Sequence, residues 1–194
     1  MSTAIIYFIA IGLCALIIGY LISIYNMLVR LSKNINKSWS NISVLLVQRH
    51  DEITKLVETC KQYMMYEQET LTQVIQARQH VEQARLHSDI NQVGQSEVTL
   101  RNVLHGLVAL AEHYPELKAN ASFQQLQGRM SQVENQIADR RELYNDCVNI
   151  NNIRIHQFPM MIVATLFRFK EYPLLEFSTE TQVDVNINVL FQQD

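Results

Sequence analysis

The first apolar run of the chain extends from Ala4 to Val29 and contains no Asp, Glu, Lys or Arg. At about 1.5 Å per helical residue, a helix over this run is roughly 39 Å long, which exceeds the roughly 30 Å of a bilayer hydrocarbon core. A cleavable signal peptide has a basic segment before a shorter apolar run and small residues at its cleavage site. This run lacks these features, so we expect residues 1–29 to form a retained transmembrane helix.

Past residue 30, apolar positions recur three and four residues apart, as on one face of an α-helix. Gly94, Pro115 and Pro159 divide this pattern into segments. The sequence therefore predicts an all-α protein in which a single transmembrane helix precedes an antiparallel three- to four-helix bundle over residues 30–177. The apolar stripes comprise Ile53, Leu56, Val57, Cys60, Met64, Leu71 and Val74, then Leu100, Val103, Leu104, Leu107, Val108 and Ala111, then Phe123, Leu126, Met130, Val133, Ile137, Tyr144 and Val148.

The first segment of the bundle is long. The chain contains no Gly or Pro between Gly19 and Gly94. Within this range "VIQARQH" (74–80) is followed by the similar "VEQARLH" (81–87). A seven-residue repeat favours a long helix that packs at a shallow angle. An unbroken helix over 37–87 would be about 75 Å long, against roughly 28 Å for the second helix. Either the first helix bends back as a fourth bundle member, or its apolar stripe is left for neighbouring subunits.

Local signals place the remaining helix ends. We expect a turn at Gly94 with Ser96 as the next N-cap, and a capping box from Ser122 to Gln125. The apolar stretch "MMIVATLFRF" (160–169) is too short to span a bilayer. It is either a helix packed on the bundle or one that lies on a surface.

The last residues, 178–194, change period. Apolar and polar residues alternate there, which is a strand pattern, but no second strand is evident in the sequence. The tail is therefore either disordered or paired with another subunit or a partner. The candidate strand-pairing residues are Val183, Val185, Ile187 and Val189.

The first charged residues are all cations. Arg30, Lys33 and Lys37 follow the apolar run, and the first acid is Asp51. Because Lys and Arg are retained on the cytoplasmic side, we expect a single-pass protein of the cytoplasmic (inner) membrane with its N-terminus outside and its bundle inside. Trp39 is either an aromatic anchor in the headgroup region or a plug at the base of the bundle.

Composition supports a helical, membrane-attached protein. Five Gly and three Pro in 194 residues are few turn formers. A formal net charge of −3 gives no reason to expect nucleic-acid binding. The cysteines Cys14, Cys60 and Cys147 have no metal-site spacing, and an odd number of scattered thiols fits a reducing compartment.

We find no signature of an active site in the sequence. It has no Gly-rich phosphate loop, no His-Glu-x-x-His motif and no nucleophile elbow. His80 and His87 would lie about 10.5 Å apart along a helix, too far for one metal ion. We therefore expect no catalytic, cofactor or metal site.

Charged residues near the start of the bundle are candidates for an interaction face. "RHDE" (49–52) could form a recognition or proton-handling cluster, but we favour ordinary helix pairing, such as Asp51 with Lys55, on an exposed surface. The candidate interaction face comprises Arg49, His50, Asp51, Lys61 and Tyr63.

Four stretches resemble the LemA family of bacterial membrane proteins. They are "YNMLVRLSKNINKSWSNI", "QRHDEITKLVETCKQY", "ALAEHYPELKANASFQQLQ" and "YNDCVNINNIRIHQFPMMIVATLFRFKEYPLLEF". The resemblance extends from the span to about Phe177 and leaves out the strand-like tail. Thr54 stands where the family often has Pro, and Arg168 where it commonly has Gly. The motif residues are Tyr114, Pro115, Asn120, Tyr144, Asn145, Phe158 and Pro159.

The resemblance implies an antiparallel helical bundle behind one membrane anchor. It also implies a membrane metallopeptidase as a candidate partner, because family genes are often found beside those of such enzymes. We expect a non-enzymatic scaffold that forms homo-oligomers or presents an interaction face at the bilayer. The alternative is an adaptor or regulator of a membrane metallopeptidase or of envelope quality control.

Overall fold

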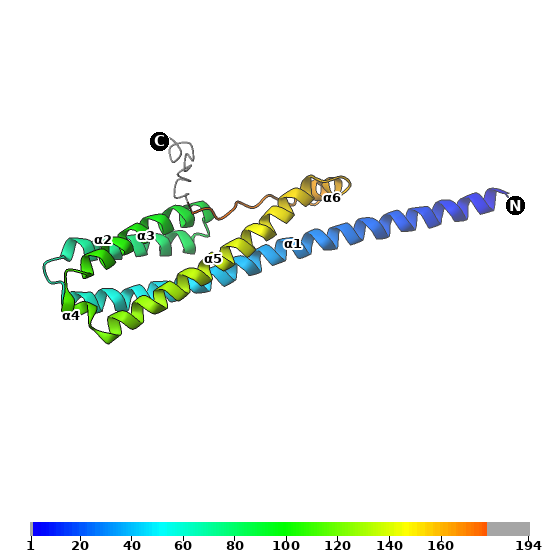
Figure 1. The fold of residues 1–194 in the computed structure, drawn as a ribbon. Coiled ribbons are helices and arrows are strands. Elements are labelled where there is room, and N and C mark those ends of the chain that lie inside the picture. Colours follow the sequence, from blue (N-terminus) through cyan, green and yellow to red (C-terminus); the bar gives the residue numbers. More distant parts are fainter. Residues whose placement is uncertain (1, 178–194) are drawn as a thin grey trace, which may run out of the picture. The chain divides into compact units, whose positions relative to one another are not determined.

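The computed structural model of the protein describes residues 2–177, and all regular structure in this range is helical. The predicted all-α fold is therefore confirmed. The candidate strand at Val183, Val185, Ile187 and Val189 lies outside the described residues. The helices are α1 (Ser2–Lys61), α2 (Gln68–Leu86), α3 (Ile90–Ala111), α4 (Pro115–Lys118), α5 (Ala121–His156) and α6 (Met160–Leu166) (Figure 1).

The described residues form two compact units. The anchor unit comprises residues 2–44 and Ile137–Leu174, and the bundle unit comprises Leu45–Gln136 and residues 175–177. Helices α1 and α5 each contribute one part to both units.

Helix α1 is continuous over 60 residues and contains the apolar run at its N-terminal end. All side chains from Ile5 to Ser23 are exposed, and the first buried ones are Ile24 and Leu28. Within residues 2–177, α1 alone is long and apolar enough to cross a membrane. Its backbone groups are paired inside the helix, as the hydrocarbon core of a bilayer requires.

The chain reverses direction after Lys61, so the first alternative for the long segment is correct. Residues 62–67 form a turn that contains neither Gly nor Pro. Met64 is fully buried in the turn, and its amide donates to the Cys60 carbonyl oxygen at 2.8 Å. Helix α2 then becomes the additional bundle member.

Helices α2 and α3 pack against each other in the bundle unit. The heptad repeat buries Val74, Ala77, Val81 and Ala84 on α2. The predicted turn at Gly94 and cap at Ser96 are wrong. Helix α3 begins at Ile90, because the Asp89 carboxylate accepts a hydrogen bond from the Gln92 amide at 3.0 Å.

Gly94 instead lies buried inside α3. A Cβ atom at this position would overlap the backbone carbonyl oxygen of Glu176. The residue is therefore needed for a close backbone approach, which only glycine allows without displacing the chain.

The start of α5 also differs from the predicted capping box at Ser122. The Asn120 side-chain oxygen accepts from the amides of Ser122 and Phe123, at 2.9 and 3.1 Å, and α5 begins at Ala121. Asn120 is thus the N-cap. The predicted stops before Pro115 and Pro159 are confirmed, since α3 ends at Ala111 and α5 at His156.

Most of the stretch 160–169 forms the short helix α6, which packs on other helices of its unit. In the anchor unit, Val163 and Ala164 of α6 are buried against Ile24 and Leu28 of α1 and Ile155 of α5. The opposite side of α6 is exposed and apolar.

Candidate functional site: an ionic cluster beneath a cleft

The most unusual feature of the bundle unit is a buried ion pair between α1 and α3. Arg49 Nη1 donates to Glu97 Oε2, and the two side chains are only 3% and 1% exposed. The prediction that Arg49 belongs to an exposed interaction face is therefore wrong, because the Arg49 side chain is buried in its ion pair with Glu97.

Two further charged residues, Glu134 and Arg101, lie next to the buried pair and are partly exposed to solvent. Glu134 of α5 lies 4.0 Å from Arg49 Nη2 and accepts a hydrogen bond from Arg101 Nε at 3.0 Å. The Arg101 guanidinium lies 5.6 Å from the centre of the Phe177 ring, within the range of a cation–π contact. The cluster thus connects α1, α3, α5 and residues 175–177 within the bundle unit.

Glu52, rather than Asp51, makes the local ion pair on α1. Glu52 is 7% exposed, and its Oε1 lies 3.2 Å from Lys55 Nζ and 3.7 Å from Arg129 Nη1. Asp51 is exposed. The "RHDE" stretch is therefore half buried, and the expected Asp51–Lys55 pairing on an exposed surface is wrong.

The electrostatics of the cluster are set by burial. Burial raises the pKa of Glu97, and this effect outweighs the opposing attraction of Arg49 and Arg101. Two buried polar atoms of the pair, Arg49 Nε and Glu97 Oε1, have no protein partner. Such atoms in a packed interior carry a desolvation cost.

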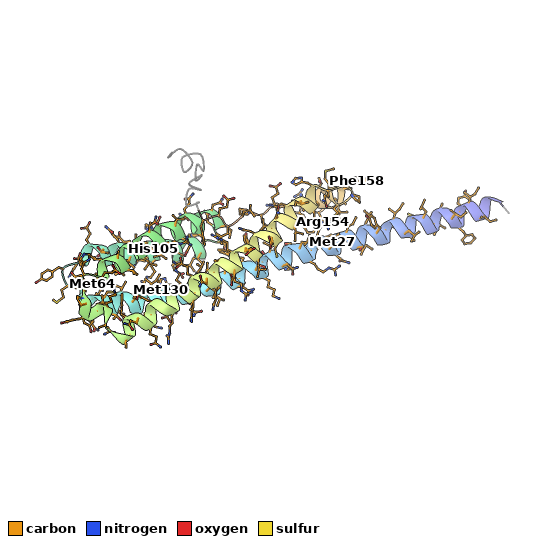
Figure 2. All side chains as sticks on the ribbon, viewed as in Figure 1. Met27, Met64, His105, Met130, Arg154 and Phe158 are labelled. Atoms are coloured by element: carbon orange, nitrogen blue, oxygen red, sulfur yellow. The ribbon has the colours of Figure 1, made fainter. Side chains whose placement is uncertain are left out.

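A cleft with a volume of about 740 Å³ opens above this cluster. It is lined by charged and polar side chains from Arg49, Arg101, His105, Glu112, Gln124 and Glu134 and by apolar ones from Leu56, Leu104, Val108 and Met130. His105 on α3 and Met130 on α5 can be located in Figure 2. The arrangement can bind a polar group through charge-assisted hydrogen bonds.

His50 lies on the other side of α1, next to α2. Burial and the charge of Arg78 lower its pKa, while Glu82 and Asp51 oppose this effect. Arg78 donates to the Thr54 hydroxyl, which in turn donates to the His50 carbonyl oxygen at 2.9 Å. Thr54 therefore joins α1 to α2 at the position where the LemA-like pattern often has Pro.

The remaining predicted residues of the interaction face lie at the turn after α1. Lys61 is exposed, and the Tyr63 hydroxyl accepts from Asn120 Nδ2 at 2.9 Å. Tyr114 donates to Glu67 Oε1 at 3.1 Å, and Pro115 begins α4. These motif residues hold the reversal between α1 and α2.

Motif residues of the anchor unit bind the segment after α6. The Tyr144 hydroxyl donates to the Pro173 carbonyl oxygen at 3.0 Å. Burial raises the Tyr144 pKa to about 12, so the hydroxyl remains a donor at neutral pH. Asn145 is half-buried, while Phe158 is 79% exposed and Pro159 is the N-cap of α6.

The residues of the predicted membrane flank differ in their exposure to solvent. Arg30, Lys33 and Lys37 are exposed, whereas Trp39 is half-buried and its ring centre lies 6.1 Å from that of Tyr144. Of the two alternatives for Trp39, the contact favours packing inside the protein.

The remaining candidates for chemistry are the cysteine thiols and the side chains that can bind a metal ion. Cys60 is fully buried, and burial raises its pKa to about 11, which keeps the thiol protonated and unreactive. Between residues 2 and 177, no group of three or more His, Cys, Asp or Glu side chains could hold a metal ion.

Comparison with known proteins gives the family. A family model described as the LemA family matches residues 38–191. The chain belongs to the LemA family. Of the stretch "YNMLVRLSKNINKSWSNI" (25–42), the match includes only residues 38–42. It also includes most of the strand-like tail, which lies outside the resemblance described from the sequence.

Two curated proteins are more distantly similar to this LemA-family chain. They are the magnetosome proteins MamQ 1 and MamQ 2 of Paramagnetospirillum magneticum strain AMB-1, each 27% identical over 92 residues. The aligned region covers 47% of this chain and 34% of each relative, so the chain spans about a third of their length.

Sequence reasoning missed three residues of the cluster, namely Glu97, Arg101 and Glu134. Glu97 lies on the apolar side of α3, four residues from the buried Val93 and three from the buried Leu100. A lone acid at such a position was the available signal, because a buried carboxylate requires a cationic partner.

Proposed function

We propose that this LemA-family protein is a membrane-anchored, non-enzymatic helical scaffold at the cytoplasmic face of the inner membrane. The observation that carries the proposal is the continuity of α1. Its exposed apolar side chains from Ile5 to Ile22 belong to the same uninterrupted helix as one buried residue of each unit, Ile24 and Ile53. Anchoring through a continuous helix supports a fixed attachment of the folded body to the bilayer.

The charge next to the span supports the cytoplasmic placement. Arg30, Lys33 and Lys37 are all exposed, and the first acid is Asp51. Cations in this position are retained inside the cell.

The contacts in the cleft support a binding or structural function over catalysis. Arg49 is paired with Glu97 and Arg101 with Glu134, while the Ser131 hydroxyl donates to the Gln127 carbonyl oxygen at 3.1 Å. These groups bind one another, whereas a nucleophile needs an adjacent general base.

Self-assembly is supported by an exposed apolar stripe on α5. Leu143, Ile150 and Ile153 are 49%, 48% and 49% exposed and lie seven and three residues apart. This spacing places them on one helix face, which is the pattern of a helix–helix contact.

Three measurements test the proposal. Alkaline carbonate should leave the full chain in the membrane, and protease should digest its body in inverted vesicles but not in spheroplasts. Light scattering in mild detergent should give an oligomer that Leu143→Gln together with Ile150→Gln reduces in size. Release by carbonate, or digestion in spheroplasts, contradicts the anchoring or its orientation.

The assembly measurement also separates the scaffold from the adaptor. A monomer that retains a membrane peptidase through purification would replace the scaffold with the adaptor function. The matched variant Asp146→Asn, which changes an exposed residue of α5 without removing apolar surface, should leave the particle size unchanged.

A further inference from the structure

The outer side of α6 and the residues next to it are apolar and exposed. Phe158 and Leu166 are 79% and 74% exposed, and Ile162 and Phe167 are 53% and 55% exposed. A contiguous apolar patch of this kind indicates an interaction surface. Phe158 marks the start of this surface in Figure 2.

The position of α6 on α1 identifies what covers this patch. Val163 and Ala164 pack on Ile24 and Leu28, at the end of the exposed apolar run of α1. The Tyr25 ring centre lies 4.7 Å from that of Phe167. Figure 1 shows α6 beside α1 at this level of the anchor unit.

The length of the span sets the depth of α6 in a bilayer. Counting from Ile5, about 20 helical residues cover the roughly 30 Å of hydrocarbon, so the opposite boundary lies near Ile24. Helix α6, which packs on Ile24 and Leu28, is therefore held at the boundary between acyl chains and headgroups.

The charges around α6 match this location. Arg30 and Lys33 on α1, Arg154 on α5, and Arg168 and Lys170 after α6 are all exposed. Arg168 and Lys170 line a hollow of about 480 Å³ with Ser32 and Tyr172. Glu171 lines the same hollow and lies 2.5 Å from His156 Nε2, which offsets its charge when the imidazole is protonated. Cations beside an apolar surface suit phosphate headgroups.

We propose that α6 is a second membrane contact, whose outer side inserts into the cytoplasmic interface of the bilayer that α1 spans. The inference rests on the membrane anchoring proposed for α1. Phe158, Ile162, Leu166 and Phe167 enter the acyl region, while the surrounding Arg and Lys side chains reach the phosphates. Two contacts fix the rotation of α1 about its axis and orient the anchor unit on the membrane.

Tryptophan reporters in the full chain test this inference. In a Trp39→Phe background, Leu166→Trp reports α6, Leu16→Trp reports the middle of the span, and Val44→Trp reports an exposed site on α1. Val44 is 66% exposed and lies about 30 Å beyond Ile24 along the helix. Each variant is reconstituted into vesicles of phosphatidylcholine and phosphatidylglycerol whose acyl chains are brominated near the headgroup or near the centre.

Trp at position 166 should lose most of its fluorescence to shallow bromine, and Trp at position 16 to deep bromine. Trp at position 44 should lose little to either lipid. Quenching at position 16 without quenching at position 166 overturns the α6 contact and leaves the anchor intact, which is also the result if a second copy covers α6. No quenching at position 16 refutes the anchor itself. Ile162→Trp is the second reporter on α6 if Leu166→Trp does not fold.

Discussion

The two units bind consecutive parts of one stretch of chain by different contacts, residues 169–174 in the anchor unit and 175–177 in the bundle unit. In the anchor unit, neutral side chains bind its backbone: Asn152 donates to the Tyr172 carbonyl oxygen at 2.9 Å and accepts from the Tyr172 amide at 3.1 Å. In the bundle unit, Gly94 admits the Glu176 backbone, and the charged Arg101 lies over Phe177.

This difference has consequences for stability. Neutral hydrogen bonds depend little on pH and salt, whereas buried charges depend strongly on their partners. We therefore expect the bundle unit to be sensitive to single changes of charge and the anchor unit to be insensitive. The only tryptophan of the chain, Trp39, lies in the anchor unit, so its fluorescence reports that unit while circular dichroism reports all helices.

The largest expected effect comes from breaking the buried ion pair. Arg49→Met and Glu97→Gln should each lower the free energy of unfolding by about 3–5 kcal/mol, because one charged partner loses its counter-charge in the core. The double variant Arg49→Met with Glu97→Leu should lose less than either single variant, since no charge then remains buried. Urea unfolding in mild detergent, followed by circular dichroism, measures these losses.

The same experiment tests the contrast between the units. The exposed Arg154 of the anchor unit provides the matched control Arg154→Met, which should change the midpoint little. The Trp39 transition should shift less than the circular dichroism transition in the Glu97 variant. A double variant that loses as much stability as either single variant, or more, would contradict the role of the buried ion pair.

A smaller effect should follow from closing the space at Gly94. Gly94→Ala should destabilise the bundle unit by about 1–3 kcal/mol, because its Cβ atom must displace the Glu176 backbone. Gly106→Ala on the same helix meets nothing within 4 Å and should stabilise it by roughly 0.5–1 kcal/mol through helix propensity. Thermal unfolding of the two variants should therefore move in opposite directions. A gain at both positions would contradict the close approach at Gly94.

In the anchor unit, the corresponding test replaces Arg168 by glycine. Arg168 has φ 58°, the left-handed conformation that non-glycine residues adopt at a cost. Arg168→Gly should therefore raise the free energy of unfolding by about 1 kcal/mol, as followed by Trp39 fluorescence. Arg154→Gly, inside α5, should lower it by a similar amount. A loss at both positions would show that the Arg168 side chain stabilises the unit more than its backbone conformation costs.

Sequence patterns predicted the helices and their buried positions, but not the reversal of the chain after Lys61. The helices and the burial of Leu71 and Val74 followed from periodicity, which depends only on neighbouring residues. The reversal after Lys61 has no local signal, since it is held by Asn120 on Tyr63 and Tyr114 on Glu67. Such contacts connect residues that are distant in sequence.

The candidate site was predicted least well for the same reason. Arg49 was chosen for its charge and placed at the surface, but its partner Glu97 is 48 residues away. The departure from the family pattern at Arg168 did not predict its conformation either. Arg168 has a positive φ, which glycine adopts at a lower cost than arginine.

The smallest expected effect concerns His50 and pH. Because burial and Arg78 lower the pKa of His50 below its ordinary 6.5, the unfolded chain binds a proton there more readily than the folded one. Stability from the neutral imidazole is complete above about pH 6.5 and is lost as the pH falls further. Glu97 acts in the opposite direction, since its raised pKa lets acid relieve the cost of its buried charge.

His50→Gln separates the two contributions within the bundle unit. The variant should lose less stability than the wild type between about pH 7.5 and about pH 5.5. Only the wild type takes up a proton on unfolding at an imidazole that the folded state keeps neutral. The matched variant His80→Gln removes an imidazole from the exposed side of α2 and should retain the pH dependence of the wild type. Urea midpoints at both pH values measure the difference. An equal loss in wild type and His50→Gln would show that His50 does not contribute to the pH response of the bundle unit. It would leave the α1–α2 contact without a role in that response, since protonation of Glu97 acts in the opposite direction.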